Sequence, residues 1–253
     1  MNKTALITGA AGLLGPMHAE ALLEEGYKVR LSDIDLERTI EVFEKFYPIY
    51  GDKVSWRILD VTDLDSVISA FYDGEVDVLI NNAAIDPKVD AYGNMPTGII
   101  EDMDPADFDL GMDVAVKGTF LMCKYAAKHM KPGSVIINIG SDLSVIAPDQ
   151  RIYPEGQAKP ITYSAAKHAI VGMTKWLAVY LAPRGIRVNC LSPTGVFNNH
   201  PQEFVDKLST LIPLGRMARI DEYKGAIKFL ASNEASSFMT GHNLVMDGGK
   251  SVW

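Results

Sequence analysis

A tyrosine and a lysine stand four residues apart in the segment YSAAK, at Tyr163 and Lys167. On a helix, this spacing places both side chains on one face, within reach of a common ligand. A free tyrosine, with a pKa of about 10, is a poor base near neutral pH, but a neighbouring ammonium group favours its ionised form. The pair therefore indicates acid–base chemistry at an oxygen atom, although the same spacing also occurs by chance on helix surfaces.

A serine at the end of an apolar segment supports this interpretation. Ser141 ends the segment INIGS, upstream of the tyrosine. Its hydroxyl would donate a hydrogen bond to a substrate oxygen and hold that oxygen near Tyr163. The three residues together predict proton transfer coupled to hydride transfer, with a cofactor carrying the hydride.

A glycine-rich segment, TGAAGLLG, follows the first apolar run of the chain. Glycines let a backbone turn tightly and approach a pyrophosphate, while the following helix offers its free N–H groups to the anion. A tight strand-to-helix turn without a ligand would look the same. The residues expected to contact a dinucleotide here are Gly9, Gly12, Leu13, Leu14 and Gly15.

An acidic residue follows the second apolar run, in the segment LSDID. A carboxylate at this position would accept hydrogen bonds from both ribose hydroxyls of NAD and would repel the extra phosphate of NADP. Asp33 is favoured because it comes directly after the run. Asp35 is the alternative, and either residue could instead belong to a solvated turn.

Apolar runs alternate along the chain with amphipathic stretches of helical length. This alternation predicts a parallel sheet covered on both faces: a Rossmann-type, doubly wound α/β fold of about seven strands, in a single domain over residues 1–253. Expected strands are 3–8, 28–32, 54–59, 76–80, 134–139, 186–191 and 242–246, and expected helices are 13–25, 36–46, 105–130, 161–181 and 221–231. Irregular stretches at 85–104, 143–160 and 192–219 follow strand ends, where ligands bind in such sheets.

Composition excludes several other classes of function. The net charge of −8 argues against a nucleic-acid partner. No apolar run reaches the roughly 18 residues of a membrane span, and no signal peptide precedes the first strand. The five histidines show no metal-ligand spacing, and the two cysteines, in apolar stretches, fit buried thiols in a reducing cytoplasm.

Taken together, the motifs resemble the short-chain dehydrogenase/reductase family, in its single-domain branch of about 250 residues. The similarity covers nearly the whole chain and includes LDVTD, INNAAI, INIGS, YSAAK, GIRVNCLSP and MDGG in family order. The resemblance implies a Ser141–Tyr163–Lys167 centre and NAD as cofactor. Besides the glycine-rich segment and Asp33, the cofactor contacts that it implies are Asp60, Val61, Asn82, Ala83, Ala84, Tyr163, Lys167 and Val196. Asn82 could equally be a purely structural residue.

The chain departs from the family pattern at four places. The glycines are spaced GxxGxxG, which is commoner in the family's sugar-nucleotide-modifying branch, and Ala84 replaces a glycine. Ala115 stands where the family often has an asparagine that holds a water of a proton relay, so any relay must be rebuilt or absent. The segment between Ser141 and Tyr163 is longer than usual, and its additional residues, expected at the substrate rim, include Asp149, Gln150, Arg151 and Lys159.

The resemblance implies an NAD(H)-dependent oxidoreductase that interconverts a secondary alcohol and a ketone. An NAD-dependent sugar epimerase or dehydratase, and a non-catalytic NAD-binding redox sensor, remain alternatives. A cytoplasmic homotetramer or homodimer is implied, built from the helices expected at 105–130 and 161–181.

A lid over the substrate is expected at residues 194–216, with polar residues that include Asn198, Asn199 and His200. Polar side chains suit a hydroxylated substrate, and the chain resembles family members of surface-sugar and flagellin-modification pathways, which implies a sugar-like substrate. Arg151 and Lys159 suggest a sharper hypothesis, in which the substrate carries a carboxylate or phosphate.

Overall fold

The computed structural model describes residues 3–86 and 98–253, and these form one parallel sheet with helices on both faces. The strands are β1 (Thr4–Thr8), β2 (Lys28–Asp33), β3 (Val54–Ile58), β4 (Val78–Asn81), β5 (Val135–Ile139), β6 (Arg187–Pro193) and β7 (Asn243–Met246). Their order in the sheet is β3-β2-β1-β4-β5-β6-β7. The predicted Rossmann-type fold is therefore confirmed.

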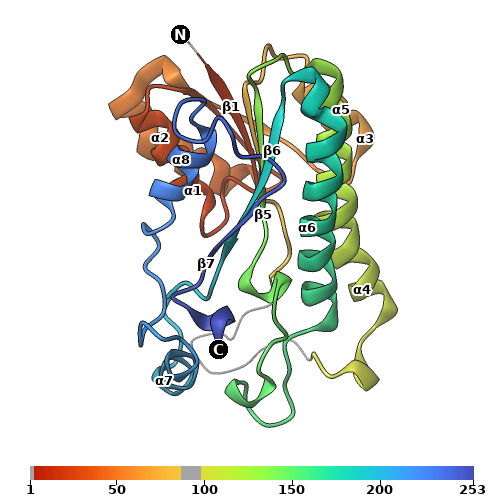
Figure 1. Ribbon diagram of the computed structural model, residues 1–253, viewed down its shortest axis with the longest axis vertical. Coiled ribbons are helices and arrows are strands. Elements are labelled where there is room, and N and C mark those ends of the chain that lie inside the picture. Colours follow the sequence, from red (N-terminus) through yellow and green to blue (C-terminus); the bar gives the residue numbers. More distant parts are fainter. Residues whose placement is uncertain (1–2, 87–97) are drawn as a thin grey trace.

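Two groups of helices cover the two faces of the sheet (Figure 1). One face carries α1 (Gly15–Glu24), α2 (Leu36–Tyr50) and α8 (Lys224–Ala231). The other carries α3 (Leu64–Ala70), α5 (Gly118–His129) and α6 (Ile161–Leu181), and α4 (Pro105–Met112) leads into α5. The short helix α7 (Gln202–Thr210) lies beyond the sheet, near the lower end of the view in Figure 1.

The central strands are apolar along their whole length because both of their faces are covered. All five residues of β5 are buried, and β4 is buried throughout. Among the fully buried side chains, Phe46 and Tyr223 fill the α1–α2–α8 side, whereas Met122 and Leu181 fill the other. The sheet thus packs against its helices through two separate apolar layers, one on each face.

The order of the strands places a crevice at the middle of the sheet. The chain runs from β1 outward to β3, and then crosses to β4 on the other side of β1. Loops that follow β1 and β4 therefore diverge, and such a switch point is where open α/β sheets bind ligands. Several of the predicted site residues, among them Gly9, Asn82 and Ser141, lie just after these two strands and β5.

Some elements differ from the sequence-based expectation. The helix expected at 105–130 consists of α4 and α5 joined by a π-helical turn, Asp113–Lys117. Helix α3 was not expected, and α8 begins three residues later than predicted. Residues 87–97, within the irregular stretch expected at 85–104, lie outside the described residues. No helix in the described part of the chain is both long enough and apolar enough to span a membrane.

A small third cluster of apolar side chains lies beyond the carboxyl edge of the sheet. It joins Ile152, from the long segment after β5, to Leu208, Ile212 and Met217 from the expected lid. The lid thus packs on the long segment between Ser141 and Tyr163. This contact encloses the space above the central strands.

Candidate active site

A cavity of about 820 Å³ opens along the carboxyl edge of the sheet, from the glycine-rich segment to the lid. Nearly all of the residues predicted for the site line it. They are Gly9, Gly12, Leu13, Leu14, Asp33, Asp60, Val61, Asn82, Ala83, Ala84, Ser141, Tyr163, Lys167 and Val196. Gly15 is not among the lining residues. The structure thus brings one extended ligand site together from segments far apart in the sequence.

The glycine-rich segment is shaped by close approach of backbones. Gly9 has a φ of +61°, and a Cβ there would lie 2.7 Å from the Cα of Ala83. Gly15 begins α1, where a Cβ would lie 2.5 Å from the carbonyl oxygen of Ala10, so its role is packing rather than lining. No side chain among the described residues caps the start of α1. Pro16 has no N–H, and the N–H groups of Met17 and His18 bond to the Leu14 carbonyl. An anion such as a pyrophosphate would therefore be received by the N–H groups of Gly15 and of the residues just before it.

The two acidic residues after β2 have different roles. Asp33 lines the cavity and accepts a hydrogen bond from the backbone N–H of Ala11 at 3.0 Å. Asp35 is the N-cap of α2 and accepts from the N–H of Arg38 at 3.0 Å. The side of the cavity at Asp33 is therefore where the structure can hold an adenosine ribose, whereas Asp35 stabilises a helix.

Asn82 and Asp60 contribute to the wall of the cavity and also hold its backbone. The Asn82 side chain donates to the carbonyl of Gly9 at 2.7 Å, which ties the end of β4 to the glycine-rich segment. Asp60 accepts hydrogen bonds from the backbone N–H and the hydroxyl of Thr62. Asn82 therefore has a structural role, since it holds the glycine-rich segment against the end of β4. Its side chain also lines the cavity, so it can contact a ligand bound there.

Tyr163 and Lys167 lie on the first turns of α6, with their side chains in the cavity. The Lys167 Nζ lies 5.5 Å from the centroid of the Tyr163 ring and donates to the carbonyl of Ile139 at 2.9 Å. Burial, and after it the Asp86 carboxylate, raise the pKa of Tyr163 well above 10, while the Ser141 hydroxyl opposes the rise. Burial lowers the pKa of Lys167. Cations near the ring are therefore needed to make a tyrosinate accessible.

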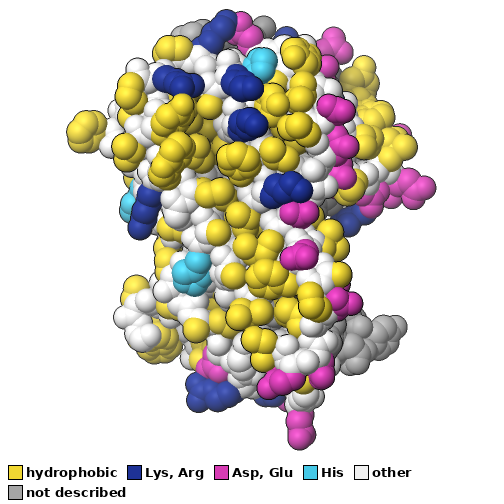
Figure 2. All heavy atoms as spheres, turned by 90° about the vertical axis from the view of Figure 1, so that its right-hand side faces the viewer, with side chains coloured by type: hydrophobic (Ala, Val, Ile, Leu, Met, Phe, Trp, Pro, Cys, Tyr) yellow, Lys and Arg dark blue, Asp and Glu magenta, His cyan; other side chains and the backbone are white. Residues whose placement is uncertain are grey.

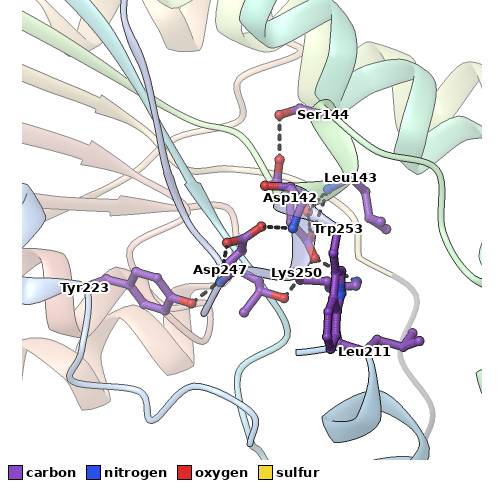
Figure 3. A network of polar contacts seen from close by, with 12 residues as sticks. Asp142, Leu143, Ser144, Leu211, Tyr223, Asp247, Lys250 and Trp253 are labelled. Carbon is purple, nitrogen blue, oxygen red and sulfur yellow. Dashed lines mark hydrogen bonds and ion pairs between the residues drawn. The ribbon is translucent and has the colours of Figure 1, made fainter. Parts of the chain in front are cut away.

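Ser141 is oriented by its neighbour in the sequence. Its hydroxyl donates to the Oδ1 of Asp142 at 2.8 Å and accepts from the N–H of Leu143 at 3.2 Å. Asp142 is buried, and its Oδ2 accepts from Thr194 and from Lys250. Ser141 is thus one end of a buried polar network that runs through Asp142 to Lys250 in the last turn of the chain. Figure 3 shows Asp142 and Lys250 within this network.

Ala115 lies buried within the π-helical turn. A second cavity of about 220 Å³ is lined by Ala115, Lys167, Tyr163, Asp107 and Thr162, among others. This cavity borders both Tyr163 and Lys167, and π-helical turns are frequent at functional sites. The cavity thus leaves room beside both Ala115 and Lys167.

The rim of the main cavity includes part of the expected set. Asp149 and Lys159 line it, together with Asn198 and His200 from the lid. Gln150 and Arg151 are not among the lining residues. The Arg151 side chain is 87% exposed and forms an ion pair with Asp149. The structure therefore gives Arg151 no place at a substrate.

Three charged residues of the site were not predicted from the sequence. Asp86 forms an ion pair with Lys159, whose Nζ lies 4.2 Å from the centroid of the Tyr163 ring. Asp142 forms a buried ion pair with Lys250. The position of Asp142 directly after Ser141 was a usable signal, because a side chain there follows the same strand end. Nothing local marks Lys250 as a buried residue.

Known proteins similar to this chain over most of its length include several dehydrogenases. A family model described as "Enoyl-(Acyl carrier protein) reductase" matches residues 9–251. A D-threitol dehydrogenase of Mycolicibacterium smegmatis is 32% identical, covering 99% of this chain and 94% of the relative. A trans-4-hydroxycyclohexanecarboxylate dehydrogenase of Sinomonas cyclohexanicum is 34% identical, covering 99% and 93%. An NAD-dependent glycerol dehydrogenase of Listeria innocua is 31% identical, covering 99% and 94%.

Solved structures of similar fold include short-chain dehydrogenases. A short-chain dehydrogenase/reductase from Serratia marcescens superposes with a TM-score of 0.86 at 29% identity, covering 99% of this chain and 98% of that one. A short-chain dehydrogenase from Leptospira borgpetersenii, with bound NAD+, gives 0.81 at 30% identity, covering 100% and 94%. The chain belongs to the short-chain dehydrogenase/reductase family. The predicted family and oxidoreductase class are confirmed, and the NAD-dependent and NAD-bound relatives agree with the predicted cofactor.

Proposed function

We propose that the protein uses NAD to interconvert a secondary alcohol and a ketone in a neutral, polyhydroxylated substrate. The observation that carries this proposal is the pairing of Lys159 and Lys250, two lysines that line the cavity, with carboxylates. Lys159 is paired with Asp86, and Lys250 is paired with Asp142, so each lysine brings its own carboxylate. Two such pairs offer hydrogen-bond donors and acceptors without a net charge, and this suits hydroxyl groups better than a carboxylate or phosphate.

In the oxidative direction, Tyr163 is the base. NAD bound in the large cavity supplies the hydride acceptor. The tyrosinate takes the proton of the substrate hydroxyl as the carbon–hydrogen bond breaks, and in reduction the tyrosine returns that proton. The ammonium groups of Lys167 and Lys159, 5.5 and 4.2 Å from the ring centroid, favour the ionised tyrosine against the effect of burial.

Ser141 positions the reacting oxygen. To do so, the hydroxyl must turn away from Asp142, at which its proton is directed in this structure, and donate to the substrate oxygen, because a ketone oxygen can only accept. The relatives agree with an alcohol substrate of this kind, because two of them are named for threitol and glycerol. The hydroxycyclohexanecarboxylate dehydrogenase supports the same reaction on a charged substrate. The paired state of Lys159 and Lys250 favours the neutral class.

The substrate class is tested by the absorbance of NADH over a panel of substrates. Threitol, glycerol and other polyols are compared with hydroxycyclohexanecarboxylates and with sugar phosphates. We expect the highest kcat/KM for a neutral polyol. Turnover confined to the carboxylates or phosphates would overturn the proposal, and turnover without net NADH would favour the epimerase alternative.

The mechanism is tested by Tyr163→Phe, which removes the hydroxyl and keeps the ring. We expect kcat to fall by at least about a hundredfold, the usual contribution of general acid–base catalysis. NAD binding, followed by fluorescence titration, should survive. Tyr72→Phe is the matched control, because Tyr72 is an exposed tyrosine away from the cavity. Full turnover by Tyr163→Phe would contradict the assigned mechanism, and NAD binding without turnover by the unchanged protein would favour a redox sensor.

A further inference from the structure

The last turn of the chain returns to the active site. After β7, Gly248 and Gly249 have φ angles of +66° and +90°, which reverse the direction of the backbone. The Asp247 carboxylate then accepts hydrogen bonds from the N–H groups of Gly249 and Ser251, at 2.9 and 2.7 Å. Figure 3 shows how this turn places Lys250 against Asp142. Lys250 is consequently only 9% exposed, although it lies beside the open cavity.

Asp142 is surrounded by four hydrogen-bond donors from three parts of the chain. Its Oδ1 accepts from the Ser141 hydroxyl and from the N–H of Leu143, both at 2.8 Å. Its Oδ2 accepts from the Thr194 hydroxyl and from the Lys250 Nζ, both at 2.8 Å. Three of these donors are neutral, and Lys250 alone brings a positive charge to the carboxylate. The charge of Asp142 is therefore balanced by a residue 108 positions away.

A buried ion pair of this kind is costly, because two charges lose their hydration. Apolar residues of similar volume often stabilise a fold as well or better. In this protein the pair borders the reactive centre, since Asp142 contacts Ser141 directly and both Asp142 and Lys250 line the cavity. Its position thus suggests a role in the reaction rather than in stability alone.

We propose that Lys250 is a positioning residue, which acts through Asp142 to hold the Ser141 hydroxyl and to balance the negative charge next to Tyr163. This inference rests on the proposed function, because it assumes that Tyr163 is the acid–base group. Lys250 itself forms its ion pair with Asp142 and acts on the reaction through that contact.

The charges around Tyr163 determine the direction of each expected effect. The groups that face it are Lys167 on its own helix, the Asp86–Lys159 pair, the Asp142–Lys250 pair and Tyr153. Burial and Asp86 raise the pKa of Tyr163 most, and the Asp142 carboxylate adds to the rise. Loss of Lys250 leaves that carboxylate unopposed, so Tyr163 should ionise at higher pH. Loss of Asp142 alone leaves an unopposed cation, so Tyr163 should ionise at lower pH.

The test is the dependence of kcat/KM on pH, measured with NAD and the best alcohol of the panel. For Lys250→Met, we expect the acidic limb to move up by roughly one pH unit, the shift that a nearby charge commonly produces. For Asp142→Asn, we expect it to move down. The acidic limb of the double variant should lie between those of the two single variants, close to that of the unchanged enzyme. Lys250→Arg keeps the positive charge, so its acidic limb should also lie close to that of the unchanged enzyme.

Controls separate this role from a structural one. Lys131→Met makes the same substitution in an exposed ion pair with Glu75, outside the cavity and the lid, and it should leave the acidic limb in place. If Lys250→Met does not fold, Asp142→Asn and the double variant still test the inference, because the acidic limb of Asp142→Asn should lie at lower pH than that of the double variant. Acidic limbs that coincide in all folded variants would overturn the inference while Tyr163→Phe remains inactive. Full turnover by Tyr163→Phe would instead overturn the proposed function.

Discussion

Asp33 accepts a hydrogen bond from the backbone N–H of Ala11 at 3.0 Å, which joins the end of β2 to the glycine-rich segment. The carboxylate is thereby held at the wall of the cavity, close to the turn that can receive a pyrophosphate. Its other oxygen accepts from the N–H of Asp35 at 3.2 Å. One side chain thus fixes both the shape of the loop and the charge where an adenosine ribose would lie.

Replacing Asp33 should change the preference between cofactors. Asp33→Ser removes the charge that repels a 2′-phosphate, and the Arg38 side chain, which also lines the cavity, can then approach that phosphate. We expect the ratio of kcat/KM for NADP to that for NAD to rise roughly tenfold or more. Asp35→Ser is the control, since Asp35 caps a helix and serine is also a good cap. An unchanged ratio in Asp33→Ser would contradict the role assigned to Asp33.

His18 should make the protein sensitive to mild acid. It lies fully buried on α1, and burial lowers its pKa from 6.5 to about 4. Between these two values the unfolded chain binds the proton more readily, so the free energy of unfolding should decrease as pH falls through this window. The whole shift corresponds to about 3 kcal/mol.

Urea unfolding at about pH 7.5 and about pH 4.5 measures this effect. Carboxylates also titrate at acid pH, so the quantity of interest is the difference between the unchanged protein and His18→Gln. We expect the variant to be less stable near neutrality and to lose less stability on acidification. Parallel losses in the two proteins would show that His18 is not responsible.

The exposed face of α5 and α6 should form an interface between copies of the chain. Figure 2 shows hydrophobic side chains gathered over this side of the molecule, and Phe120, Trp176 and Val179 are 52%, 63% and 78% exposed. A contiguous apolar patch of this kind commonly marks an interaction site. We therefore predict that the protein forms a homodimer or homotetramer through this patch.

Light scattering gives the mass directly. We expect the unchanged protein to be a dimer or tetramer, and Trp176→Glu to shift it to a smaller species. Ile49→Glu is the control, because it adds the same charge to an exposed apolar site on α2, on the other face of the sheet. A monomeric unchanged protein, or equal masses for the two variants, would contradict the assignment.

The sequence predicts the sheet well because its signals are local. Continuous apolar runs such as VIINI identify covered strands, and the glycine-rich segment marks the first crossover. Helix α3 was missed because its seven residues are too few to show a clear helical period. The π-helical turn at Ala115 was missed because the segment keeps an apolar pattern compatible with a continuous helix.

Site residues that belong to a recognisable sequence motif could be predicted. Site residues that come together only through the fold, from distant parts of the sequence, could not. Ser141, Tyr163 and Lys167 lie in recognisable segments, and the structure brings them to one cavity. Lys250 follows two glycines near the end of the chain, and lysines are mostly exposed, so no local pattern predicts its burial. Its contact with Asp142 forms only when β5, β6 and β7 pair in the sheet, because Asp142 follows β5 and Lys250 follows β7.

The strand that delivers Lys250 is one of the two edge strands of the sheet. β7 is a four-residue edge strand, and all of its residues are only half-buried. Edge segments of this kind open locally at a fraction of the global unfolding free energy. Brief detachment of β7 would withdraw Lys250 while leaving the dinucleotide half of the molecule folded. Thermal inactivation should therefore begin as a subglobal event, and hydrogen exchange at β7 should precede exchange at β5.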